Sequence, residues 1–224
     1  MEQISSSRRK FLRYAGLSGL AAAALAACTK TVKNFPGDGK GKSRDINLGS
    51  GDMGILNYAY ALEQLEAAFY TLVVAAPYEN IPSLELSRLT DIRNHEIAHR
   101  EFFKTALGKD AIPLLLPNFS MVDFSSRDSV LETAQAFEDL GVSAYNGAGS
   151  LISNPDYLTL AGKIVSVEAR HAAYIRNLVS PGSFADMTVV DSNGLDMHRS
   201  PAEVLAIAQS FLVDSLDASG LPTA

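Results

Sequence analysis

The sequence predicts an all-α protein, a four-helix bundle made of two antiparallel hairpins and followed by a short fifth helix. Four long stretches repeat their apolar residues at helical spacing rather than in strict alternation. Two of the connections between these stretches are short and one is long. The chain has 224 residues, of which 47% are hydrophobic and none is tryptophan. This length and composition favour one well-buried core rather than two domains.

The first two helices form the first predicted hairpin. Apolar residues recur at helical spacing from Asp52 to Ala76, and Pro77 ends this run because proline cannot continue a helix. Ser83 is the expected N-cap of the second helix, and Gly108 closes that helix.

The third and fourth helices form the second predicted hairpin. The third is expected over residues 126–152, and the fourth begins at Asn154-Pro155, an N-cap followed by a proline at the first helical position. The fourth helix ends before residues 181–224, an extension that caps one end of the bundle or forms a partner surface. Within it a fifth helix begins at Ser200, where the Ser-x-x-Glu spacing forms a capping box.

The lengths of the loops determine the predicted topology. A helix of about 25 residues is roughly 37 Å long, so a loop of about six residues cannot return along it. Both short loops must therefore join antiparallel neighbours. Between Gly108 and Ser126 lie about 17 residues, which at roughly 3.3 Å each can cross the whole bundle. We expect one long crossover between two hairpins, although a loop of this length can also be a surface excursion.

The N-terminal residues 1–27 are expected to be a signal peptide. The Arg8-Arg9 pair with Phe11 behind it resembles the twin-arginine export signal, and the apolar stretch that follows is too short to span a bilayer stably. This stretch ends at Cys28, the only cysteine of the chain, in a setting that resembles a bacterial lipobox. We expect Cys28 to be lipidated; the alternative is an ordinary small residue in a cleaved leader.

The residues after the signal indicate an acidic, exported domain. Residues 28–51, rich in Lys, Gly, Asn and Ser, are expected to form a flexible tether. The protein would thus be lipid-anchored in the cell envelope, in the periplasm or at the outer membrane. Removing residues 1–27 discards four positive charges and one negative charge and takes the net charge from -6 to -9. No basic face remains for phosphate, so no nucleic-acid partner is expected.

Two Glu-x-x-His pairs are the first indication of a functional site. Glu96 and His99 lie in the second predicted helix, and Glu168 and His171 lie in the fourth. A spacing of three residues places each carboxylate and imidazole on one helical face. One such pair alone arises easily by chance, so the pairs become persuasive only if further ligands face them.

Two further glutamates face these pairs. Glu63 lies mid-way along the first helix with Tyr70 seven residues later, and Glu138 lies mid-way along the third with Tyr145 seven residues later. The two hairpins thus repeat one pattern. Counting about 1.5 Å per residue from each connection, the glutamates of each hairpin meet at the same height within about one turn.

Four glutamates in the middle of apolar helices are costly to bury as anions unless they are paired or bind metal. Two divalent ions would neutralise the four carboxylates, and two neutral imidazoles would complete the ligand set. Oxygen and nitrogen ligands without thiolate favour iron or manganese, and zinc is compatible with the same ligand types. The expected cofactors are therefore two Fe or Mn ions.

One Glu from each of two helices and one Glu-x-x-His from each of the other two resemble the di-iron carboxylate pattern of the ferritin-like superfamily, over about residues 52–180. The stretch from Leu56 to Tyr70 is also similar to desiccation-related ferritin-like proteins of bacteria and plants. The resemblance implies that Glu63 and Glu138 are terminal carboxylates and that Glu96 and Glu168 are bridging carboxylates. It also implies one imidazole per metal, from His99 and His171.

Four nearby residues are candidates for a further ligand or for a contact with the ligands: Glu66, His95, Tyr70 and Tyr145. Glu66 lies one turn after Glu63 on nearly the same face, but its counterpart in the second hairpin is Gly141, so Glu63 is preferred. His95 points about 100° away from Glu96, which favours solvent or a contact with a ligand over ligation. The tyrosines are expected to be core residues with bonded hydroxyls rather than redox-active groups.

Three functions are compatible with the sequence. The first is a metalloprotein, an oxidase or peroxide-consuming enzyme, whose reduced metals react with oxygen or peroxide in oxidative or desiccation stress. The second is a metal-stabilised binding or stress-protection module without turnover. The third is a bundle whose glutamates pair with arginines, with Arg93, Arg100, Arg170 and Arg176 as candidates. The expected partners are metal ions, a small oxidant, the membrane through the lipid anchor and, in a homo-oligomer, further copies of the chain.

Overall fold

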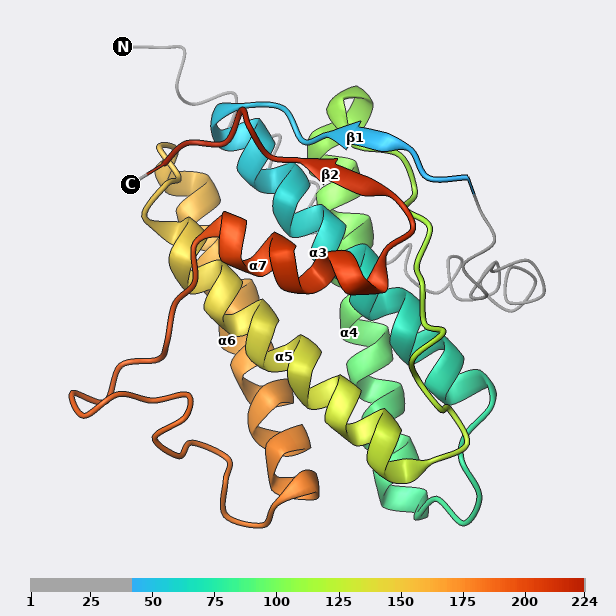
Figure 1. Cartoon of the computed structure of the whole chain (residues 1–224). Coiled ribbons are helices and arrows are strands. Elements are labelled where there is room, and N and C mark those ends of the chain that lie inside the picture. The colour runs from blue at the N-terminus through green and yellow to red at the C-terminus, as the bar shows by residue number, and fades with distance from the viewer. Residues whose placement is uncertain (1–41, 224) are drawn as a thin grey trace.

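The computed structural model describes residues 42–223 and confirms the predicted all-α, ferritin-like four-helix bundle with a short fifth helix. Figure 1 shows the four long helices side by side and α7 lying across them. The bundle consists of α3 (Gly51–Ala75), α4 (Ser83–Leu107), α5 (Arg127–Gly149) and α6 (Pro155–Val179), and α7 covers Pro201–Ala208. The predicted signal peptide and Cys28 lie outside the described residues.

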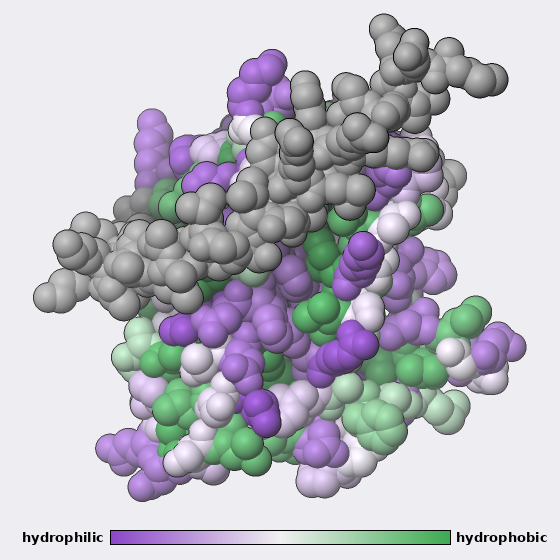
Figure 2. Space-filling view, turned by 180° about the vertical axis from the view of Figure 1, so that it is seen from behind, coloured by the Kyte–Doolittle hydropathy of each residue, from purple (hydrophilic) through white to green (hydrophobic). Residues whose placement is uncertain are grey.

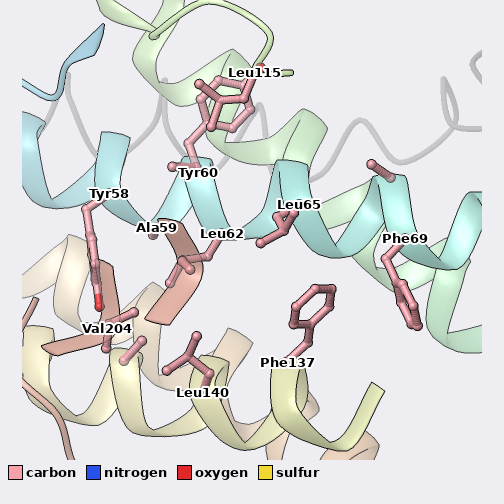
Figure 3. Close-up of a cluster of buried hydrophobic side chains, with 14 of the residues drawn as sticks. Tyr58, Ala59, Tyr60, Leu62, Leu65, Phe69, Leu115, Phe137, Leu140 and Val204 are labelled. Atoms are coloured by element: carbon pink, nitrogen blue, oxygen red, sulfur yellow. The ribbon is translucent and has the colours of Figure 1, made fainter. Parts of the chain in front are cut away.

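Helix α3 is the central helix of the bundle. Every residue from Gly54 to Tyr70 is buried, which is typical of a helix packed on all sides. It packs closely against α4 in the first hairpin, as α5 does against α6 in the second. Figure 3 shows Leu62 and Phe69 of α3 directed toward α5, while Tyr60 points the other way, toward Leu115 of the crossover. The middle of the bundle is therefore shielded from solvent.

The helix ends follow the predicted signals with one exception. Asn154 caps α6 through its side chain, which accepts from the backbone of Asp156, and Gly108 closes α4 with a φ of 58°. The exception is the start of α4. Pro82 occupies the capping position, and Ser83 is the first helical residue rather than the predicted cap.

The long connection between α4 and α5 is the predicted crossover and runs along the length of the bundle (Figure 1). It begins with a 3-10 turn, Gly108–Asp110, and is held by two amides of α3. The side chain of Asn57 accepts from the Ile112 amide at 2.9 Å, and that of Gln64 accepts from the Leu115 amide at 2.8 Å. These bonds satisfy backbone groups that would otherwise be buried without partners.

The segment before α3 differs from the predicted tether. Strand β1 (Asp45–Asn47) pairs in parallel with β2 (Ser215–Asp217), and Leu48 is fully buried. Residues 45–51 therefore belong to the folded domain, and the predicted tether to residue 51 was too long at this end. The pairing joins segments about 170 residues apart, which no local sequence pattern reveals.

A buried carboxylate fixes this terminal pairing. Asp214 is fully buried and pairs with the Arg44 guanidinium, with 2.8 Å between Arg44 Nε and Asp214 Oδ1. It also accepts from the Leu116 amide at 2.8 Å. Burial opposes ionisation of this carboxyl, but these two donors outweigh burial and hold the pKa of Asp214 below its usual range. Asp214 thus links the N-terminal strand, the crossover and the C-terminal segment.

The C-terminal extension covers the seam between α3 and α5. Val204 of α7 is fully buried and lies opposite Tyr58 and Leu140 (Figure 3). The extension approaches α5 so closely that a Cβ atom at Gly147 would lie 1.8 Å from the Arg199 carbonyl oxygen. On the opposite face, where the grey residues leave the described residues visible, hydrophilic and hydrophobic side chains are mixed (Figure 2). Within residues 42–223, no helix combines the length and the apolar character that crossing a membrane requires.

Candidate metal centre

Six predicted site residues converge in the middle of the bundle. They form two groups that overlap, and within each group one ligand atom of every residue lies within 4.8 Å of the others. The first group is Glu63, Glu96, His99 and Glu168, and the second is Glu96, Glu138, Glu168 and His171. Glu96 and Glu168 belong to both groups. Each group therefore has one carboxylate and one imidazole of its own, and the two groups share two carboxylates.

Each imidazole faces three carboxylates. His99 Nδ1 lies 2.7 Å from Glu168 Oε1, 3.4 Å from Glu63 Oε2 and 3.6 Å from Glu96 Oε2. His171 Nδ1 lies 2.9 Å from Glu96 Oε1, 3.1 Å from Glu168 Oε2 and 3.5 Å from Glu138 Oε2. The Nδ1 atoms thus occupy equivalent places in the two groups. This equivalence follows from the repeated Glu-x-x-His spacing on α4 and α6.

Several of these atoms are buried and make no hydrogen bond of normal geometry among the described residues, although the imidazoles and carboxylates lie within ion-pair distance of one another. They are one oxygen each of Glu63, Glu138 and Glu168, both oxygens of Glu96, and His99 Nδ1. Native proteins rarely leave so many buried polar atoms unsatisfied in one place. Bound cations would satisfy these atoms and neutralise the carboxylates, so the residues present fit a metal centre.

Two tyrosines fix the carboxylates that the groups do not share. The Tyr70 hydroxyl of α3 donates to Glu138 Oε1 of α5 at 2.5 Å. Reciprocally, the Tyr145 hydroxyl of α5 donates to Glu63 Oε1 of α3. In each carboxylate the second oxygen remains directed to the imidazole of its group. The predicted bonded hydroxyls are present, and the crossed pairing between the hairpins is a feature that was not predicted.

His95 contacts the centre without belonging to either group. It lies at the surface of α4, and its Nδ1 is 2.8 Å from Nε2 of His171. If His171 Nδ1 binds a metal, the proton of this neutral ring is on Nε2 and is donated to His95. His95 therefore contacts a candidate ligand, His171, and such a contact is one of the two roles expected of it.

Glu66 is buried beside the centre but lies in neither group. Burial raises the pKa of Glu66 well above its ordinary value, and the carboxylates of Glu96 and Glu168 raise it further. A Cβ atom at Gly141 would lie 3.1 Å from Glu66 Oε1, so the glycine makes room for this side chain. The two hairpins thus differ here, and Glu63 rather than Glu66 is placed with the other candidate ligands.

This difference gives a matched pair of variants. Glu63→Gln is expected to bind about one Mn(II) ion where the wild type binds about two, because only one group loses a carboxylate. Glu66→Gln is expected to keep both ions, because an amide of the same shape fits beside Gly141. Equilibrium dialysis against Mn(II) measures both. If Glu66→Gln loses an ion and Glu63→Gln keeps both, then Glu66 rather than Glu63 is the metal ligand.

The arginines proposed as alternative partners bind elsewhere. The guanidinium groups donate to neighbours outside the centre: Arg93 to Asn94, Arg100 to Glu101, Arg170 to Ser166, and Arg176 to Asp139 and Asp186. The interpretation of the glutamates as partners of these arginines is therefore wrong. Among the described residues, the imidazoles and two tyrosine hydroxyls are the hydrogen-bond and ion-pair partners of these carboxylates.

Protons take the place of cations in the metal-free centre. Burial opposes a charged imidazole at His171, but the carboxylates of Glu138, Glu168 and Glu96 outweigh burial and raise its pKa to about 12. The pKa of His99 is raised for the same reason, chiefly by Glu63. Burial, reinforced by Glu168, raises the pKa of Glu96. Near neutral pH both imidazoles are therefore protonated until a metal displaces the protons.

Metal binding is consequently expected to weaken as the pH falls. Each ion must displace at least one imidazole proton, because both imidazole pKa values lie above the working range. Between pH 8 and 6 the affinity for Mn(II) should fall at least about tenfold per pH unit and per ion. Titration calorimetry in two buffers of different ionisation enthalpy counts the released protons. An affinity that is independent of pH would contradict protonated imidazoles.

The fold is a four-helix bundle with a buried cluster of carboxylates and imidazoles that could hold metal ions, an arrangement known from one class of helical bundles. The family model described as a ferritin-like domain matches residues 51–181, which span α3 to α6. The chain belongs to the ferritin-like domain family. A search of curated proteins gives no match.

Proposed function

We propose that this protein holds two Fe or Mn ions and that the centre reacts with oxygen or peroxide, as part of a defence against oxidative or desiccation stress. The observation that carries the proposal is the pair of overlapping ligand groups that share Glu96 and Glu168. A shared pair of carboxylates is the arrangement that holds two cations close together. A single structural ion would leave one imidazole and one carboxylate without a role.

Each residue has a defined part in this proposal. Glu63 and His99 would hold one ion, Glu138 and His171 the other, and Glu96 and Glu168 both. Two adjacent redox-active ions bound there would supply the two electrons that reduction of peroxide to water requires. Tyr70 and Tyr145 orient the unshared carboxylates, and the bond from His171 to His95 fixes the ring so that Nδ1 faces the centre.

The surroundings of the centre also support chemistry in a site from which water is excluded. Glu96 and Glu138 are fully buried, and Glu63 and Glu168 are 1% exposed. Electrostatic interactions are stronger in such a site than in water, and a small uncharged oxidant can reach it more easily than an ion. The ligand types accept zinc as well, but zinc has no redox chemistry, so the native metal decides between turnover and a purely structural role.

We also propose that the protein is exported and lipid-anchored at Cys28. The support is the twin-arginine-like Arg8-Arg9 pair and the lipobox-like sequence that ends at Cys28. The twin-arginine route carries folded cargo, which suits a protein that must load metal before export. Labelling with an alkyne-bearing fatty acid tests the anchor. The wild-type chain should take up label and Cys28→Ala should not.

Peroxide consumption by the Fe(II)-loaded protein tests the proposed reaction. The wild type is expected to consume peroxide far faster than Glu96→Gln/Glu168→Gln treated with the same Fe(II), since the variant lacks the shared carboxylates. Free Fe(II) also reacts with peroxide, so the comparison is made after removal of unbound metal. Two bound ions without reaction toward oxygen or peroxide would sink the catalytic proposal and leave a metal-stabilised module.

A further inference from the structure

A pocket lies inside one end of the bundle, next to the candidate metal centre. Side chains from all four long helices line it, at the end where α3 and α6 begin and where α4 and α5 end. Its empty volume is about 550 Å³ when the open space outside its mouth is included. Protein interiors otherwise contain few voids larger than a water molecule.

The inner end of the pocket adjoins the ligands of the centre. Leu62 precedes Glu63, Phe103 follows His99 by one turn, and Ile164 precedes Glu168 by one turn, and all three apolar side chains line the pocket. Tyr145 also lines it, and its hydroxyl donates to Glu63. One hydrogen bond therefore connects the pocket wall with a candidate ligand.

The other end of the pocket reaches the surface between α4 and α6. There Ala106 is exposed and Ala161 is half-buried, and both line the pocket. On α3 and on α6 the lining spans eight residues of helix, from Ile55 to Leu62 and from Tyr157 to Ile164, which corresponds to a rise of roughly 10 Å along the bundle axis. The pocket is thus a path from the surface toward the centre.

The chemistry of the lining selects the ligand. Among the described residues that form its wall none is charged, and tyrosine hydroxyls are the only polar side-chain groups. An apolar cavity of this kind disfavours ions, since nothing in it replaces their hydration. It therefore offers no path for metal ions as cargo. An uncharged molecule with an aliphatic chain is the ligand that this lining stabilises.

We infer that the pocket binds an uncharged organic molecule with a medium-length aliphatic chain and holds one end of that chain beside Glu63 and Tyr145. The inference deepens the proposed function, and it rests on that function because the neighbouring cluster is taken to be a metal centre. It assigns an apolar organic reactant, in addition to the small oxidant, to the same site.

Titration calorimetry with n-octanol as the probe tests this inference on the full-length protein. The wild type is expected to bind about one equivalent with a negative heat-capacity change, the mark of apolar burial. Ala106→Phe/Ala161→Phe places two rings at the mouth and should weaken binding at least about tenfold. The control Thr105→Phe/Thr159→Phe adds two rings to exposed positions of the same helices outside the pocket and should bind octanol as the wild type does.

The outcomes separate the pocket from the metal chemistry. No saturable octanol binding, or equal binding by both double variants, would overturn the inference and leave the pocket as a route for oxygen alone. Octanol binding without peroxide reaction would sink the proposed function but not the pocket. Metal content is measured on every variant. If Ala106→Phe/Ala161→Phe does not fold, the single change Ala106→Phe is compared with the single change Thr105→Phe, and the same difference in octanol binding is expected.

Discussion

Glu96→Gln/Glu168→Gln is expected to fold and to lose both metal ions. The two glutamates are the only residues that belong to both ligand groups, so their loss removes two ligands from each ion. Glutamine keeps the side-chain volume, and the imidazoles that the lost carboxylates kept protonated can release their protons, so the metal-free variant should still fold. Equilibrium dialysis should find about two Mn(II) per wild-type chain and fewer than about 0.2 per variant chain.

The matched control changes two glutamates of the bundle surface. Glu101 lies on α4 and Glu132 on α5, outside both ligand groups, and Glu101→Gln/Glu132→Gln removes the same total charge. The control should bind metal as the wild type does. Retention of two ions by the Glu96 and Glu168 variant would show that the shared carboxylates do not hold metal.

Asp214→Ala is expected to lower the free energy of unfolding by about 3 kcal/mol, because the change leaves the Leu116 amide without its acceptor and removes the ion pair with Arg44. The value lies at the low end for a buried pair, since the Arg44 side chain is 41% exposed and can be solvated. For a domain of this size the melting temperature should fall by roughly 10 °C. Thermal unfolding followed by circular dichroism measures the change.

Asp217→Ala is the control for this prediction. Asp217 ends β2, three residues after Asp214, is exposed, and accepts from the Asn47 side chain at 2.7 Å. Its loss should cost less than about 0.5 kcal/mol. If both variants melt together, the buried carboxylate does not hold the terminal strands on the bundle.

The helices were predictable because their ends are marked by local chemistry. Pro77 follows α3, Gly108 ends α4, and Asn154-Pro155 begins α6, each through a constraint that acts within one turn. The β1–β2 pairing was not predictable, because it joins short segments from the two ends of the domain. Its register depends on Asp214 and Arg44, which no periodicity relates.

The candidate site was predictable as far as helical spacing determines it. The i, i+3 pairs on α4 and α6 place Glu and His on one face, and loop lengths set their heights. Helical spacing places Glu63 and Glu66 on nearly one face of α3, and the sequence favoured Glu63 only because Gly141 stands opposite Glu66 in the repeated pattern. Packing against Gly141 separates them, and only the assembled bundle contains that contact. The crossed bonds from Tyr70 and Tyr145 likewise depend on how α3 and α5 meet.

The metal content of the purified wild-type protein tests the central claim most directly. Elemental analysis of the folded chain, expressed with iron and manganese both supplied, should find about two ions of Fe or Mn per chain. A folded protein that contains neither metal, and that takes up neither when both are offered at neutral pH, would contradict the two-ion centre.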